Sequence, residues 1–151
     1  MTGQSVFRSA SDRRADIQRQ ARAMGVDDAF VDLLVEEFYA RVRAHPALGP
    51  IFQAAIGDAW AVHLAKMKDF WSSIALNSGR YSGKPVPAHQ KLTGVTPAHF
   101  SVWLGLFFAT LDDIAPTPAA ARFFKERAER IAESLQLAMF GHPMLRTETV
   151  K

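Results

Sequence analysis

The chain has 151 residues, of which 48% are hydrophobic and 22% are charged, a balance typical of one compact globular domain. It contains no cysteine, which excludes disulfides, thiolate zinc sites, iron–sulfur clusters and thiol catalysis. No apolar run reaches the roughly 20 residues that span a bilayer, and the N-terminus lacks the apolar segment of a secretion signal. We therefore expect a cytoplasmic protein with no membrane partner.

The formal net charge of +3 is concentrated at the N-terminus. Residues 1–22 contain five arginines and two aspartates, and the rest of the chain is neutral. Phosphate binding needs an extended positive surface, so we expect no nucleic-acid partner. We interpret residues 1–26 as a basic N-terminal extension, frayed or helical, residues 27–141 as the domain, and residues 142–151 as a C-terminal tail.

Apolar residues recur at helical spacing along the chain, without the alternation of strands, which predicts an all-α fold. Asp27 is the expected N-cap of a first long helix that ends at His45-Pro46. A turn around Leu48-Gly49-Pro50 follows. Gly57-Asp58 then leads into a helix over about residues 59–76.

A long loop is predicted over residues 77–87, because this stretch has two glycines and two prolines. A short helical piece that carries His89 comes next. Thr96-Pro97 and Thr117-Pro118 are helix start signals, since each pairs a capping hydroxyl with a proline at the first helical position. They predict two further helices, the last of which stops at Gly141.

Histidines are the remaining candidates for a metal ligand, and there are five: His45, His63, His89, His99 and His142. His45 and His142 precede prolines, so we interpret both as exposed turn residues. His63 lies on an apolar helix face, where a core histidine bonded to backbone or water is the alternative. No histidine has a carboxylate three residues away, so the di-iron and zinc-protease patterns are absent. A haem needs only one axial imidazole from the protein, and the residues alone leave open which histidine supplies it.

Seven motifs in a fixed order resemble the group III truncated haemoglobins, over about residues 28–141. They are Phe38-Tyr39, Leu48-Gly49-Pro50-Ile51-Phe52, Trp60-x-x-His63, Phe70-Trp71, Tyr81-x-Gly83-x-Pro85, His89-x-x-Leu92 and Phe100-x-x-Trp103-Leu104. Any one of these pairs alone would carry no information, but the ordered set is specific.

The resemblance implies a bacterial truncated globin, a two-over-two helical sandwich around one haem b, with His89 as the proximal iron ligand. It implies a distal, ligand-binding set of Tyr39, His63, Met67 and Trp103. The residues expected to contact the haem are Phe52, Met67, Phe70, Trp71, Arg80, Tyr81, Leu92 and Trp103.

Several of the site roles that the resemblance implies have an alternative explanation. The Tyr39 hydroxyl and the Trp103 N–H are expected to donate to a bound gas molecule, although a tyrosine reaching solvent and an indole bonded to a backbone carbonyl are the plainer explanations. His63 is expected to act as a ligand gate, as a sixth iron ligand or as a residue near the haem edge. The cations expected near the haem propionates are Arg80, Lys84 and Lys91, although surface lysines are more often simply solvated.

The function expected from this resemblance is reversible binding of oxygen, nitric oxide or carbon monoxide at a pentacoordinate iron, for oxygen transport, storage or sensing. A second hypothesis is enzymatic: nitric oxide detoxification by dioxygenation, or peroxide chemistry. That activity would need an external reductase as a partner, since the chain has no reductase domain. A third hypothesis, a haem-free helical interaction module, is tested by the absorption spectrum of the purified protein.

Overall fold

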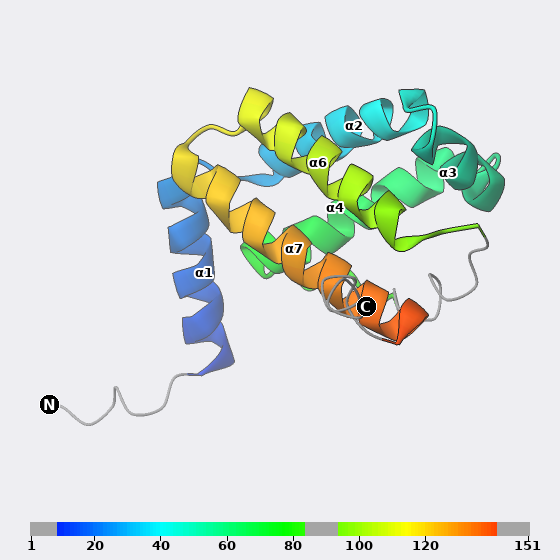
Figure 1. Cartoon of the computed structure of the whole chain (residues 1–151). Coiled ribbons are helices and arrows are strands. Elements are labelled where there is room, and N and C mark those ends of the chain that lie inside the picture. The colour runs from blue at the N-terminus through cyan, green and yellow to red at the C-terminus, as the bar shows by residue number, and fades with distance from the viewer. Residues whose placement is uncertain (1–8, 84–93, 142–151) are drawn as a thin grey trace, which may run out of the picture.

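The computed structural model describes residues 9–83 and 94–141, and every regular element in those two ranges is an α-helix (Figure 1). The six helices are α1 (Ala10–Met24), α2 (Asp28–Ala44), α3 (Leu48–Ile56), α4 (Trp60–Leu76), α6 (Pro97–Ile114) and α7 (Pro118–Phe140). The prediction of an all-α fold is confirmed. Within the described ranges, no helix is both long and apolar enough to cross a membrane.

The helices form two layers, with α2 and α4 in one and α6 and α7 in the other (Figure 1). α2 packs against α6, which joins the layers, and α3 covers one end of α2. Between the layers, Phe38 of α2 meets Trp103 and Phe107 of α6 edge-on, with ring centroids 5.6 and 5.0 Å apart. This aromatic contact between layers is the centre of the core, and it encloses one side of the site described below.

Most helix ends lie where local sequence signals predict them. The Asp27 side chain accepts a hydrogen bond of 2.8 Å from the Phe30 backbone N–H, which caps α2. The Thr117 hydroxyl accepts one of 3.1 Å from the Ala120 N–H, which caps α7, and Gly141 ends that helix with a φ of 89°. These predictions are confirmed because each depends only on neighbouring residues.

The expected turn at Leu48-Gly49-Pro50 is wrong, because these residues form the first turn of α3. Pro50 is tolerated there because the first-turn N–H groups have no intrahelical acceptor. His45 was expected to be an exposed turn residue, but it is half-buried and its Nδ1 accepts hydrogen bonds from the Ala47 and Leu48 N–H groups, at 3.0 and 3.3 Å. The imidazole therefore takes the place of a conventional N-cap.

The basic N-terminal segment contains the helix α1, and part of that helix is packed. Ala21 is fully buried, and the Gln18 side-chain amide donates to the Leu76 carbonyl at the end of α4, at 3.1 Å. The Thr117 hydroxyl donates to the Met24 carbonyl at 2.7 Å, which joins the end of α1 to the start of α7. These contacts attach α1 to both layers.

Candidate functional site

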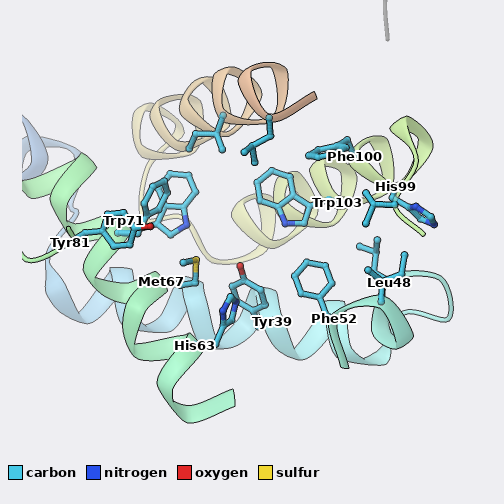
Figure 2. Close-up of a pocket in the computed structure, with 15 residues that line it drawn as sticks. Tyr39, Leu48, Phe52, His63, Met67, Trp71, Tyr81, His99, Phe100 and Trp103 are labelled. Carbon is cyan, nitrogen blue, oxygen red and sulfur yellow. The ribbon is translucent and has the colours of Figure 1, made fainter. Parts of the chain in front are cut away.

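A cavity of about 130 Å³ lies between the layers (Figure 2). Most of the side chains that line it are apolar or aromatic: Tyr39, Leu48, Ile51, Phe52, His63, Met67, Phe70, Trp71, Tyr81, Val95, His99, Phe100, Trp103, Ile131 and Leu135. Protein interiors are usually packed to near crystal density, so a cavity of this kind marks a place for a ligand. Its walls would suit a large, flat, apolar molecule.

Tyr39 extends from α2 into the cavity and carries a hydroxyl group there (Figure 2). The residue is only 6% exposed, and no other described residue forms a hydrogen bond with the hydroxyl. Burial raises the pKa of this phenol well above its ordinary value. The group is thus a protonated donor at neutral pH, directed at whatever fills the cavity.

His63 of α4 lies beside Tyr39 on the same wall. Its imidazole meets the Tyr39 ring edge-on at 5.1 Å and the Trp60 ring edge-on at 5.8 Å. Trp60 is itself fixed, because its indole N–H donates to Gln53 Oε1 at 3.0 Å and the Arg43 guanidinium lies 4.3 Å from its ring centroid. His63 therefore stands between two rings whose positions are set by other contacts.

Two tryptophans form part of an aromatic stack along the wall of the cavity. The Trp103 and Phe107 rings are 2° from parallel at 5.7 Å, and the Trp71 and Phe107 rings are 19° from parallel at 5.1 Å. Phe107 is buried behind the two indoles, which both face the cavity. Both indoles are thus packed against the same buried ring.

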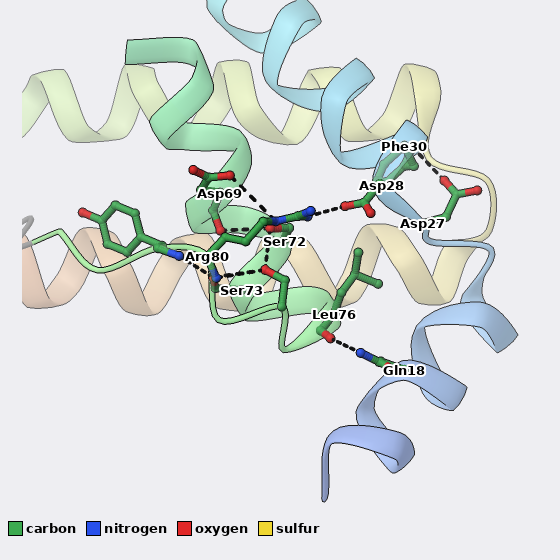
Figure 3. A network of polar contacts seen from close by, with 11 residues as sticks. Gln18, Asp27, Asp28, Phe30, Asp69, Ser72, Ser73, Leu76 and Arg80 are labelled. Atoms are coloured by element: carbon green, nitrogen blue, oxygen red, sulfur yellow. Dashed lines mark hydrogen bonds and ion pairs between the residues drawn. The ribbon is translucent and has the colours of Figure 1, made fainter. Parts of the chain in front are cut away.

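The loop after α4 brings Tyr81 to one end of the cavity, where its ring is edge-on to the Phe70 ring at a centroid distance of 5.1 Å. The Ser73 hydroxyl accepts a hydrogen bond from the Tyr81 N–H at 3.1 Å (Figure 3). Arg80 points the other way: its guanidinium binds Asp28 at 2.6 Å and lies 3.8 Å from Asp69. The loop is thus held on both sides by polar contacts.

The structure brings most of the expected site residues together in the cavity lining: Tyr39, Phe52, His63, Met67, Phe70, Trp71, Tyr81 and Trp103. Arg80 does not join them, because its ion pairs hold it on the outer side of the loop. The other expected positions, His89, Leu92, Lys84 and Lys91, lie outside the described residues.

Part of the lining was not among the expected site residues, although Leu48, Ile51 and Phe100 belong to the sequence motifs. These lining residues are Leu48, Ile51, Val95, Phe100, Ile131 and Leu135. Ile131 and Leu135 are four residues apart on α7, a spacing that signals a buried helix face but does not distinguish a packed core from a cavity wall. His99, one of the five histidines considered as a metal ligand, also lines the cavity.

Comparison with known proteins agrees with this arrangement. No protein-family model matches the chain. A curated protein of Campylobacter jejuni named group 3 truncated hemoglobin ctb is 36% identical over 112 residues, which cover 72% of this chain and 87% of that protein. The crystal structure of the group III truncated hemoglobin from Campylobacter jejuni superposes with a TM-score of 0.72 at 32% identity, over 76% of this chain and 92% of that one.

Proposed function

Because the chain belongs to the group III truncated haemoglobins, and is thus a haem protein of the globin type, we propose that its cavity holds haem b and that a diatomic gas, oxygen foremost, binds there reversibly at a pentacoordinate iron. The observation that carries the proposal is the cavity itself. It is lined by apolar and aromatic side chains, with a buried tyrosine hydroxyl directed inward.

The residues of the cavity fit this cofactor chemically. A porphyrin is flat and largely hydrocarbon, so it gains from burial against Phe52, Met67, Phe70 and Trp71. A haem brings four nitrogen ligands of its own and needs one imidazole from the chain, for which His89 is our candidate on the family resemblance. When bound, the haem supplies a ferrous iron at which a diatomic gas can bind.

Two donors of the chain would then face the gas. The Tyr39 hydroxyl is protonated at neutral pH, and Trp103 presents an indole whose ring is fixed by Phe107 and Phe38. A ligand that carries partial negative charge would be held by hydrogen bonds from such donors, each contributing about 1.5–3 kcal/mol. We propose that these two side chains set how slowly the gas leaves.

His63 is our candidate for the gate that controls access to the cavity. It is half-buried on the cavity wall, between the rings of Tyr39 and Trp60. Met67 lies one helical turn after His63 and lines the same wall of the cavity. Its unbranched side chain can adapt to ligands of different size. Rotation of the imidazole would open or close the space beside the Tyr39 hydroxyl.

The absorption spectrum of a His89→Ala variant tests the cofactor assignment. We expect the wild-type chain with added haem to show the Soret band of a histidine-ligated haem. The variant is expected to lose haem, or to hold an iron whose spectrum imidazole restores. His142→Ala is the matched control, since His142 has no proposed part in the site. An unchanged spectrum in His89→Ala would mean that another histidine is the ligand, and a wild-type chain that takes up no haem would contradict the proposal itself.

A further inference from the structure

His99 lies in the first turn of α6 and lines the end of the cavity away from Trp71 and Tyr81 (Figure 2). Its Nδ1 accepts a hydrogen bond of 2.9 Å from the Thr96 backbone N–H and lies 3.2 Å from the Thr96 hydroxyl. This is a capping box in which histidine occupies the place where glutamate or glutamine usually stands. This hydrogen bond fixes the position of the ring and determines which of its two nitrogens carries the proton.

A backbone N–H can only donate, so the Nδ1 atom that accepts from it carries no proton. In the neutral imidazole the proton is then on Nε2, which makes Nε2 a hydrogen-bond donor. A histidine that binds a metal through Nε2 has the opposite arrangement, with a bare Nε2 and a proton on Nδ1 directed at an acceptor. The capped form of His99 therefore offers a hydrogen-bond donor at Nε2 and is unsuited to bind iron through that atom.

The surroundings of His99 restrict what can accept from it. The lining residues around this end of the cavity include the apolar Leu48 and Phe100, and Val95 packs against the cluster that contains Phe100. In Figure 2 the imidazole sits at the rim, with its nitrogens turned away from the middle of the cavity where Tyr39 and Met67 lie. Tyr39 is thus placed to donate a hydrogen bond to a gas molecule in the middle of the cavity. His99 is placed to donate only to the outer edge of the molecule that fills the cavity.

The periphery of a haem is hydrocarbon except for its two carboxylates. We propose that His99 binds one of these carboxylates through its Nε2–H, and so sets which way round the macrocycle lies. This inference depends on the proposed function, since it needs a haem in the cavity. It assigns His99, one of the five histidines considered as a metal ligand, a role as a hydrogen-bond donor instead.

The test uses two substitutions that keep the cap. Glutamate and glutamine both accept from the N-cap N–H in a capping box, so His99→Glu and His99→Gln should leave the start of α6 intact. Glutamine still offers an N–H to a carboxylate, whereas glutamate offers none and adds a negative charge. The measurement is the rate at which each holoprotein releases haem to an excess of a haem-free globin, read from the Soret band.

We expect His99→Glu to release haem about tenfold faster than wild type and His99→Gln to stay close to wild type, since a hydrogen bond to a charged group is lost only in the first. With haem dimethyl ester, whose carboxylates are blocked, the three proteins should release at similar rates. A glutamate variant that releases haem at the wild-type rate, or an equal effect of glutamate with the ester, would overturn the inference. A wild-type chain that binds no haem would instead contradict the proposed function.

Two further measurements keep the test decisive. If circular dichroism shows that His99→Glu is not helical, wild type alone decides: equal release rates for haem and its dimethyl ester contradict the inference. In a His89→Ala background, adding His99→Gln should leave the spectrum unchanged. A histidine-ligated spectrum that disappears on adding His99→Gln would show that His99 binds iron.

Discussion

The Tyr39 phenol and the His63 imidazole stand edge-on, with ring centroids 5.1 Å apart and ring planes at 89°. They come from different helices, α2 and α4, and both face the same cavity. Because the rings are in contact, the imidazole cannot move inward without meeting the phenol. Any gating motion of His63 is therefore limited by Tyr39, the residue that we propose donates a hydrogen bond to the gas.

Replacing Tyr39 with phenylalanine removes one hydroxyl and leaves the ring contacts in place. We expect the oxygen dissociation rate of the ferrous protein to rise about tenfold or more, because a hydrogen bond to a charge-bearing ligand is lost. Stopped-flow displacement of oxygen by carbon monoxide measures the rate. Tyr81→Phe is the matched control, since Tyr81 is the other tyrosine of the chain and lines one end of the cavity, away from Tyr39. Equal effects of the two substitutions would contradict the role proposed for Tyr39.

Alkaline pH should reveal the burial of Tyr39 as a loss of stability. Burial raises the pKa of this phenol above its ordinary value of 10.0. Below about pH 10 neither the folded nor the unfolded chain ionises it, so its contribution is constant. Above that pH the unfolded chain loses a proton that the folded chain retains, so the free energy of unfolding falls as pH rises.

Urea denaturation of the haem-loaded protein at pH 9 and pH 11 measures this effect. We expect the loss of stability between the two pH values to be smaller in Tyr39→Phe than in wild type. Burial also raises the pKa of Tyr81, but Tyr81 is present in both proteins and cancels in the comparison. An identical loss in the two proteins would mean that the Tyr39 hydroxyl reaches water.

Arg80→Ala tests whether the ion pair with Asp28 anchors the loop that leads to Tyr81. Both side chains are at least half exposed, so we expect the free energy of unfolding to fall by less than about 1 kcal/mol. The larger effect should be local: amide hydrogen exchange in residues 77–83, followed by mass spectrometry, should become faster.

Lys125→Ala is the control for Arg80→Ala, because Lys125 of α7 forms an ion pair of 2.7 Å with Asp112 of α6, and neither residue belongs to this loop. It should leave exchange in residues 77–83 unchanged. If Arg80→Ala also leaves it unchanged, the Ser73 hydroxyl and the other polar contacts hold the loop without the guanidinium.

Thr117→Ala removes two interactions at once. The hydroxyl caps α7 through the Ala120 N–H and also donates to the Met24 carbonyl at the end of α1. We expect the free energy of unfolding to fall by about 1–3 kcal/mol, measured by urea denaturation. Thr117→Ser, which keeps the hydroxyl, should retain most of the stability. Equal losses in both variants would assign the effect to the methyl group.

The sequence predicts those parts of the fold that depend on near neighbours. Asp27 and Thr117 cap the helices that follow them, and Gly141 ends the last helix. The start of α3 could not be predicted in this way, because the His45 imidazole caps it and histidine is not among the usual capping residues. Only the three-dimensional position of the ring shows that its Nδ1 meets the Ala47 and Leu48 N–H groups.

In the candidate site, too, some features could be predicted from the sequence and others required the three-dimensional structure. The ordered motifs place Tyr39, His63 and Trp103 in one lining, although these residues are far apart in the chain. The position of Arg80 could not be predicted, since a cation near a cofactor and a cation paired with Asp28 look alike in sequence. The donor role of His99 also depends on geometry, because it follows from the direction of one hydrogen bond.

The aromatic wall of the cavity has an optical consequence. Trp71 and Trp103 line the cavity, and Trp60, the third tryptophan of the chain, lies 6.2 Å from the ring of Tyr39. All three indoles are thus close enough to pass their excitation to a strongly absorbing molecule placed between the layers. The tryptophan fluorescence of the chain should therefore be strong when the cavity is empty and quenched when it is filled. Its intensity can be used to follow haem uptake and release in real time.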